Sequence, residues 1–203
     1  NRKQCAVLEY GSCIDTEGTR RTPLNDGILH LLFMGVDWER KGGEIAVETT
    51  RLLNERGIKT VLTVMGLKVE PDSCKNREYI NLVGFLNKNT PAEYERMKTI
   101  FRTTDILLLP TKAECSAVVF CEAADYGTAV VTYDTGGVVS YVKNGLNGSR
   151  LPEGSPASVF ADEIERIWKT DGELDRLSSG ARKMAQERLN WNNWTKWFKE
   201  NVI

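Results

Sequence analysis

Short, continuous runs of apolar residues alternate along the chain with longer segments of helical periodicity, starting at about residue 28. Such a run is typical of a strand buried on both faces, as in a parallel sheet covered by helices. The expected strands are 29–34, 60–65, 80–83, 105–109 and 129–132, with a sixth near 148–151. The alternation predicts an α/β fold, with a Rossmann-like parallel sheet of about six strands and helices on both faces.

Helix signals fill the intervals between these strands. Apolar residues recur at helical spacing over residues 45–53, and Gly57 follows as a stop signal. Thr90 is an expected N-cap because Pro91 follows it at the first helical position, and this helix is expected to run toward Phe101.

A helical tail is expected from about residue 156, opened by Ser155 and Pro156. Within it, Trp191, Trp194 and Trp197 recur at every third position, which places three indole rings along one helical stripe. The stripe packs either on the core of this domain or on a partner domain, and the sequence leaves both open.

Length and composition fit one globular domain. With 203 residues, of which 41% are hydrophobic and 27% charged, the chain can form one substantial core. Residues 1–27 contain several glycines, a proline and a cluster of charges, which indicates an entry segment or linker. Residues 28–203 form the expected domain.

The charge balance argues against a polyanionic partner. Twenty-seven basic residues against 28 acidic ones give a net charge of −1, so no electrostatic footprint for nucleic acid or an anionic membrane is present. The apolar runs are far shorter than the roughly 20 residues needed to cross a bilayer, and the start does not resemble a signal peptide. We expect neither nucleic-acid binding nor a membrane span.

The cysteines predict a reducing compartment. Cys5, Cys13, Cys74, Cys115 and Cys121 are an odd number without CxxC spacing, so we expect a cytoplasmic protein. Cys115 and Cys121 are interpreted as small buried hydrophobic residues rather than as a redox pair.

The first candidate site follows the first expected strand. Gly35 opens a loop that carries Arg40 and Lys41 and reaches a glycine-rich helix start. Ligands of open α/β sheets bind outside the carboxyl ends of strands, and cations beside a helix N-terminus are suited to phosphate. Without that context, the two residues would be interpreted as solvated surface cations.

The second candidate is the pair Glu114 and Glu122, which lies between a strand and a nearly all-apolar helix. Residues 118–124 leave almost no polar face, so Glu122 is an expected buried acid that needs a partner. With Ser116 as the expected cap, the two acids are too far apart to touch and are suited to hydroxyls at two ends of an elongated ligand. The alternative is an exposed Glu114 and a structurally paired Glu122.

A third loop also follows a strand, where Gly136 and Gly137 permit an unusual turn or the close approach of a ligand. Since all three loops follow parallel strands, they are expected to converge on one rim.

The sequence lacks the residues that several kinds of catalytic, metal and nucleotide-binding site require. The single histidine, His30, lies in an expected strand and is interpreted as a core residue, which argues against Ser-His-Asp and multi-histidine zinc sites. The sequence contains no GxGxxG, no P-loop and no Asp-x-Asp. We expect no bound metal and no cofactor.

Five motifs in this order resemble the donor-binding half of a GT-B glycosyltransferase, within the retaining family 4, the glycosyl transferases group 1. They are Lys41-Gly42, the Glu-x7-Glu pattern of Glu114 and Glu122, Glu122-Ala123 with Gly127, Thr135-Gly136-Gly137, and Asn144-Gly145 with Asn147-Gly148. The resemblance covers residues 29–152. The chain departs from the family at Val36, Ala117, Ala129 and Ser140, where the family often has arginine, glycine, proline and an acid.

The resemblance implies a nucleotide-sugar substrate, such as a UDP- or GDP-sugar, and a role for each candidate residue. Glu114 would contact the donor sugar, Glu122 the ribose, and Arg40 and Lys41 the diphosphate. The amides of Ser116, Ala117 and Val118 would complete the phosphate cradle, Phe85 would lie near the base, and Gly35, Gly136 and Gly137 would line the site.

The resemblance also implies sugar transfer with retention and without a metal, in which neither glutamate is a covalent nucleophile. The acceptor-binding N-terminal domain would be absent, so this chain alone is expected to be inactive and to bind nucleotide weakly. Any membrane contact of the full-length protein would be made through that absent domain.

Two other classes of function compete with this interpretation. A non-catalytic nucleotide-binding regulatory module of flavodoxin-like topology would use the glutamates only for structure. A two-domain sugar-nucleotide epimerase would share the architecture but ordinarily needs acid/base histidines, and His30 is the only one here.

Overall fold

The computed structural model describes residues 6–16, 18 and 20–202. Its strands are β1 (Leu29–Met34), β2 (Thr60–Met65), β3 (Ile80–Gly84), β4 (Ile106–Leu109), β5 (Ala129–Tyr133) and β6 (Gly148–Leu151). Its α-helices are α1 (Gly43–Glu55), α2 (Pro91–Thr103), α3 (Val118–Tyr126), α4 (Val138–Tyr141), α5 (Ala157–Lys169), α6 (Glu173–Glu187) and α7 (Trp191–Asn201). A 3-10 helix, η2 (Asp72–Cys74), lies between β2 and β3.

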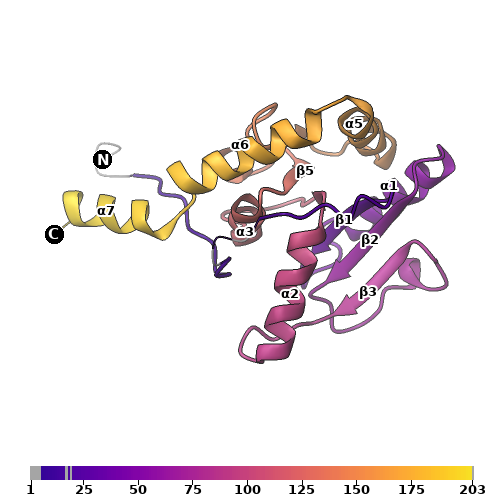
Figure 1. The fold of residues 1–203 in the computed structure, drawn as a ribbon, viewed down its shortest axis with the longest axis horizontal. Coiled ribbons are helices and arrows are strands. Elements are labelled where there is room, and N and C mark those ends of the chain that lie inside the picture. The colour runs from indigo at the N-terminus through magenta and orange to yellow at the C-terminus, as the bar shows by residue number, and fades with distance from the viewer. Residues whose placement is uncertain (1–5, 17, 19, 203) are drawn as a thin grey trace.

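The strands form one six-stranded parallel sheet with the order β3-β2-β1-β4-β5-β6. The chain builds outward from β1 to β3 on one side and then returns to the centre for β4 (Figure 1). The strand order therefore reverses between β1 and β4, and in such sheets the loops after these two strands border the ligand crevice.

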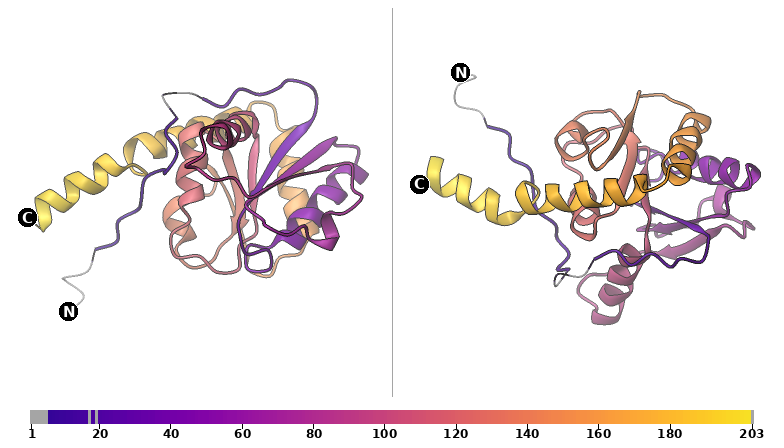
Figure 2. Two further views of the ribbon diagram at one scale, coloured as in Figure 1. Left: turned by 90° about the horizontal axis from the view of Figure 1, so that it is seen from below. Right: turned by 45° about the horizontal axis from the view of Figure 1, so that its top comes forward.

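Helices cover both faces of the sheet, as predicted. α1 packs with α5 on one face, and α2 and α3 lie on the other, where α6 packs on α3 (Figure 2). The core between these layers contains fully buried aromatic side chains from β1, α2, α3 and α5. They are Phe33, Phe101, Phe120, Tyr126 and Phe160.

The predicted strands agree with the structure to within one residue at each end. β1, β2 and β6 have the expected bounds, whereas β3 and β5 each extend one residue further. β4 begins at Ile106 rather than at residue 105. The Asp105 carboxylate accepts the His30 backbone N–H at 2.9 Å, and the Asp105 backbone N–H donates to the His30 carbonyl at 2.8 Å.

The leading segment, residues 6–27, forms no helix or strand in its described part and is held against the domain. The Arg21 backbone N–H donates to the Tyr126 carbonyl at 2.9 Å, and its guanidinium pairs with Asp105 at 2.7 Å. The side chains of this ion pair are only 5% and 6% exposed. Whether the segment is an interdomain linker stays a prediction.

The tryptophan stripe of α7 does not pack on the sheet core. α7 extends beyond the main body of the molecule in all three ribbon views, and none of its described side chains is buried (Figures 1 and 2). Trp191 donates its indole N–H to the Ser12 carbonyl at 2.8 Å, and Trp194 stacks on Phe198 with ring centroids 5.2 Å apart. The stripe thus contacts the leading segment and its own helix.

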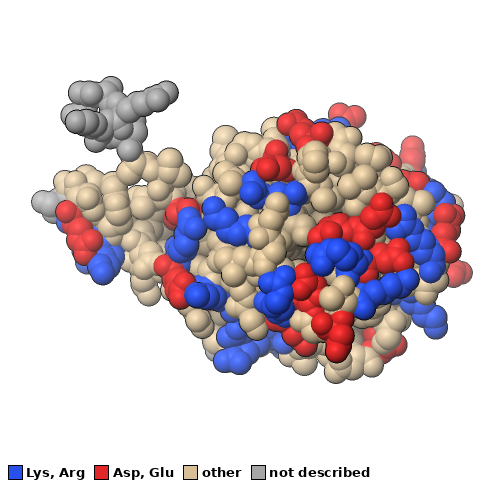
Figure 3. Space-filling view, turned by 90° about the horizontal axis from the view of Figure 1, so that it is seen from above, with Lys and Arg blue, Asp and Glu red and all other residues tan. Residues whose placement is uncertain are grey.

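Charged side chains of both signs are interspersed over the face seen from above (Figure 3). This mixture agrees with the balanced composition and shows no single-sign patch on that face. Among the helices in the described part of the chain, none combines the length and the apolar character that spanning a bilayer requires.

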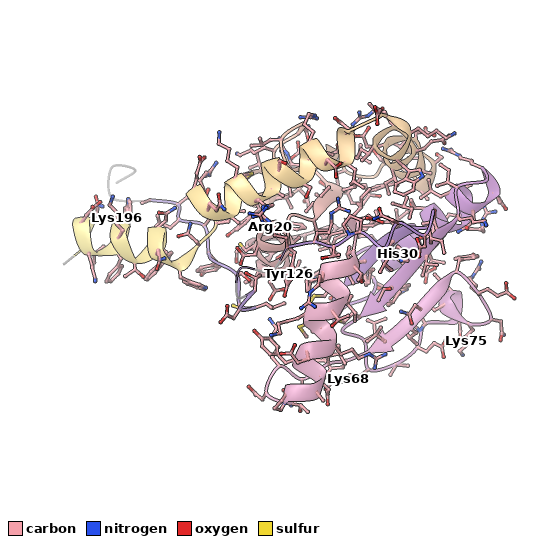
Figure 4. All side chains as sticks on the ribbon, in the orientation of Figure 1. Arg20, His30, Lys68, Lys75, Tyr126 and Lys196 are labelled. Atoms are coloured by element: carbon pink, nitrogen blue, oxygen red, sulfur yellow. The ribbon has the colours of Figure 1, made fainter. Side chains whose placement is uncertain are left out.

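The interpretation of His30 as a core residue is wrong. Its side chain is 21% exposed, and its Nε2 lies 3.1 Å from the Asp26 carboxylate, because it occupies the amino end of β1 near the surface (Figure 4).

The interpretation of two cysteines as buried holds for Cys121 alone. Cys115 is exposed because it belongs to the loop after β4, while Cys121 is buried in α3. Burial raises the pKa of the Cys121 thiol to about 12, so this thiol stays protonated and unreactive at neutral pH. Cys5 lies outside the described residues.

Candidate functional site

The loops after β1 and β4 lie against each other at the point where the strand order reverses. Gly42, the N-cap of α1, has a φ of 76°, and a Cβ added there would lie 2.1 Å from the Pro110 carbonyl oxygen. The Lys112 backbone N–H donates to the Arg40 carbonyl at 2.8 Å. Only glycine permits both the left-handed backbone and this close approach, which places Arg40 and Lys41 beside the β4 loop.

Glu114 receives both of these cations. The Lys41 ammonium forms an ion pair with the Glu114 carboxylate, and Arg40 Nη1 lies 3.7 Å from the same oxygen. Arg40 also donates to the Ala113 carbonyl at 3.0 Å. The side chains of Lys41 and Glu114 are only 11% and 12% exposed, so Glu114 is not the exposed loop acid of the alternative interpretation.

The paired glycines bring the β5 loop to the same place. The Gly137 N–H donates to the Glu114 carbonyl at 2.8 Å, and a Cβ on Gly137 would lie 1.9 Å from the Cys115 carbonyl oxygen. A Cβ on Gly136 would lie 2.2 Å from the Glu114 carbonyl oxygen. Both glycines therefore serve close packing between two loops of the protein, and the predicted convergence of three loops is confirmed.

Glu122 is buried as predicted, with 2% of its surface exposed. Lys88, in the loop after β3, donates to Glu122 Oε1 at 2.6 Å. Sequence reasoning missed Lys88, although a cation just after a strand of a parallel sheet was the signal that identified Lys41. The two glutamates thus have separate cationic partners from separate loops.

Replacing Lys88 with methionine is expected to destabilise the fold by about 1–2 kcal/mol, because a buried carboxylate would lose its cation. The figure is below the range for fully buried pairs since the Lys88 side chain is 36% exposed. Urea unfolding measures the loss. Adding Glu122→Gln to this variant is expected to restore part of it, because the uncharged amide needs no cation; a double variant less stable than Lys88→Met would contradict this account.

The prediction that Ser116 caps α3 is wrong. The N-cap is Ala117, in an extended conformation, and no side chain accepts a hydrogen bond from the first turn. The helix begins at Val118, one residue later than a Ser116 cap would place it. Its first amides are therefore available to a ligand, which adds an anion-binding helix N-terminus to the neighbouring cations.

An apolar pocket of about 240 Å³ lies at the carboxyl ends of β1, β2 and β3. Its lining includes Met34, Gly35, Phe85, Leu86 and Lys88, so it adjoins the Lys88–Glu122 pair. The Phe85 side chain is 50% exposed, and Lys68, labelled in Figure 4, lies with its ammonium 5.8 Å from the ring centroid. A flat aromatic ligand group would fit between such walls.

These groups all lie along the carboxyl edge of the sheet. The apolar pocket lies at one end, Glu122 with Lys88 follows, and the uncapped helix start with Lys41, Arg40 and Glu114 lies at the switch point. Such a site can hold a planar group, hydroxyls and an anionic group in sequence. Val36, which stands where the family often has arginine, is 71% exposed. In this chain, Arg40 is the arginine that reaches Glu114.

This fold is that of one half of a GT-B glycosyltransferase, and its resemblance to solved structures extends over the whole chain. Alr3699/HepE from Anabaena, solved in complex with UDP and glucose, matches with a TM-score of 0.77 at 16% identity, over 100% of this chain and 57% of that one. Sucrose-phosphate synthase from Thermosynechococcus elongatus matches with a TM-score of 0.76 at 17% identity, over 96% and 52%.

The chain belongs to the family glycosyl transferases group 1, whose model matches residues 16–184. It is 27% identical over 189 residues to a D-inositol 3-phosphate glycosyltransferase from Xylanimonas cellulosilytica, covering 88% of this chain and 44% of that protein. It is 26% identical over 172 residues to the uncharacterized glycosyltransferase MJ1607 from Methanocaldococcus jannaschii, covering 82% and 42%. The chain therefore spans less than half the length of these curated relatives.

Proposed function

We propose that this chain is the donor-binding domain of a retaining glycosyltransferase that transfers a hexose from a nucleotide diphosphate to an acceptor without a metal ion. The observation that carries the proposal is the meeting of Arg40, Lys41 and Glu114 beside the uncapped start of α3, at the switch point of the sheet. Membership of a glycosyltransferase family favours this function over a regulatory module.

Each part of the site takes one part of the donor. The base occupies the apolar pocket beside Phe85, and the ribose hydroxyls donate to Glu122. The diphosphate lies over the amides at the start of α3, where Arg40 and Lys41 neutralise it. Anabaena Alr3699/HepE, which shares this fold, has been solved with UDP-glucose, so a uridine nucleotide is the first ligand to test.

The chemical step depends on stabilising the departing nucleoside diphosphate. As the bond between the sugar and the diphosphate breaks, negative charge grows on the phosphate oxygen, and the preorganised cations and amides favour that state. Glu114 orients the sugar through its hydroxyls. The acceptor hydroxyl attacks from the face that the diphosphate leaves and passes its proton to the departing phosphate oxygen, so the configuration is retained without a covalent intermediate on either glutamate.

The acceptor site belongs to a second domain outside this sequence. The relatives from Xylanimonas and Methanocaldococcus are more than twice as long as the matched region, which leaves room for such a domain. We propose that the full-length protein is cytoplasmic, that any membrane contact is made by that domain, and that this chain alone does not transfer sugar.

Calorimetry with UDP, GDP and ADP tests the donor assignment. Wild-type chain is expected to bind one of them weakly, with a Kd on the order of 0.1 mM, and Glu122→Ala to weaken that binding about tenfold because the ribose hydroxyls lose a charged acceptor. Glu200→Ala on the exposed face of α7 is the control. Equal affinity of Glu122→Ala and wild type would refute the ribose assignment, and sugar transfer by this chain alone would refute the need for a second domain.

A further inference from the structure

A second polar pocket, of about 300 Å³, lies at the opposite edge of the sheet from the donor site. It is formed by the leading segment, the C-terminal end of α3 and one face of α6. Its lining includes Arg20, Arg21, Tyr126, Ser178 and Arg182. Arg20 and Tyr126 lie near each other beside α6 in Figure 4, and the Arg21 N–H donates to the Tyr126 carbonyl.

Two of the three arginines in this pocket lack a countercharge. Arg21 is neutralised by Asp105 at 2.7 Å and by Asp175 at 3.3 Å. Within residues 6–16, 18 and 20–202, neither Arg20 nor Arg182 has an ion-pair or hydrogen-bond partner on its side chain. Burial lowers the pKa of Arg182, and the nearby charge of Arg20 lowers it further, so the two guanidinium groups are close enough to repel each other.

Tyr126 lies beneath this pocket and packs against α2. The residue is fully buried, its ring stacks on Phe101 with centroids 5.5 Å apart, and its hydroxyl has no hydrogen-bond partner in the described structure. Burial raises the pKa of this phenol to about 12, so the hydroxyl keeps its proton at neutral pH.

We propose that this pocket binds a phosphate monoester through the guanidinium groups of Arg20 and Arg182. Two planar guanidinium groups match the paired oxygens of a phosphate, and Ser178 supplies a further hydroxyl at the wall. The volume suits a phosphate that carries a small organic group. Because Arg20 belongs to the leading segment and Arg182 to α6, the anion would tie that segment to the helix and act as a regulatory ligand.

The test is calorimetric titration with inorganic phosphate. It uses chain carrying Arg40→Gln and Lys41→Gln, so that phosphate cannot bind at the donor site. In this background, Arg20→Gln and Arg182→Gln are each expected to weaken binding about tenfold, because each removes a charged hydrogen bond to the anion. Arg56→Gln is the matched control, since Arg56 pairs with Asp162 and Glu165 on the other face.

Arg20 is exposed, so its substitution keeps the test valid even if Arg182→Gln impairs folding. The proposal would be overturned if phosphate did not bind, or if its affinity were unchanged by both substitutions. An equal loss of affinity in the Arg56→Gln control would indicate an adventitious ion only and would also overturn it. Titration with glycerol 3-phosphate, and separately with vesicles of phosphatidylcholine and phosphatidic acid, distinguishes a soluble phosphate monoester from a lipid headgroup. Tight binding of glycerol 3-phosphate assigns a soluble ligand, and binding of the vesicles alone assigns a lipid headgroup.

Discussion

Replacing Lys41 with glutamine is expected to weaken UDP binding by roughly 30- to 100-fold, which corresponds to about 2–3 kcal/mol for a charged hydrogen bond to a phosphate group. The effect is large because the Lys41 side chain is only 11% exposed, so water screens its charge poorly. Gly42 and the β4 loop fix the lysine in place, so little conformational entropy is lost when the ligand binds. Competition NMR measures affinities in this weak range.

Glu114→Gln is expected to change UDP affinity in the opposite direction. The Glu114 carboxylate holds Lys41 in an ion pair and repels a diphosphate, so the neutral amide is expected to strengthen UDP binding several-fold. Sugar transfer by the full-length protein would nevertheless fall, because the carboxylate that orients the donor sugar is lost. Arg56→Gln serves as the control for a general change in charge.

The two substitutions together separate a phosphate site from a structural ion pair. If Lys41 and Glu114 only stabilised the fold, both variants would lower the unfolding midpoint and neither would strengthen binding. Unchanged UDP affinity in Lys41→Gln would therefore exclude the assignment of Lys41 to the diphosphate. A decrease in UDP affinity in Glu114→Gln would exclude the account in which the Glu114 carboxylate competes with the diphosphate for Lys41.

The sheet could be predicted from sequence because both of its faces are buried. β4 is built only from Ile and Leu and is fully buried, so its apolar run has no polar interruption and its bounds are visible in the sequence. The meeting of Lys41 and Glu114 followed from the same signal, since loops at the carboxyl ends of adjacent parallel strands share one rim. In a parallel sheet, the positions of the strands in the sequence therefore predict which loops lie together at the site.

The features that could not be predicted depend on contacts between distant segments. Lys88 pairs with Glu122 across 34 positions, and Arg20 shares a pocket with Arg182 across more than 160. The prediction that Ser116 caps α3 was wrong for a local reason. Ser116 precedes the helix start by two residues, so its hydroxyl does not accept a hydrogen bond from the first turn. Propensity favours serine at such a position, but the β4 loop dictates where this helix begins.

Gly137→Ala is expected to destabilise the fold by about 3 kcal/mol, because the new methyl group has no space. The backbone of Gly137, with φ −78° and ψ −2°, is one that alanine adopts without strain, so the cost is steric alone. The methyl carbon would lie 1.9 Å from the Cys115 carbonyl oxygen, and a rigid loop backbone cannot yield as a flexible side chain can. The β5 loop must move away from the β4 loop.

That movement carries a functional consequence. The Gly137 N–H holds the Glu114 carbonyl, so displacing it shifts Glu114 and its ion pair with Lys41, and UDP binding is expected to fall about tenfold in molecules that remain folded. Gly154→Ala is the matched control: its Cβ meets nothing within 4 Å, and its φ of 81° costs alanine about 1–2 kcal/mol. Urea unfolding followed by UDP titration compares the two variants. Equal stability in both, with UDP binding retained in Gly137→Ala, would mean that the contact between the β4 and β5 loops does not position the site.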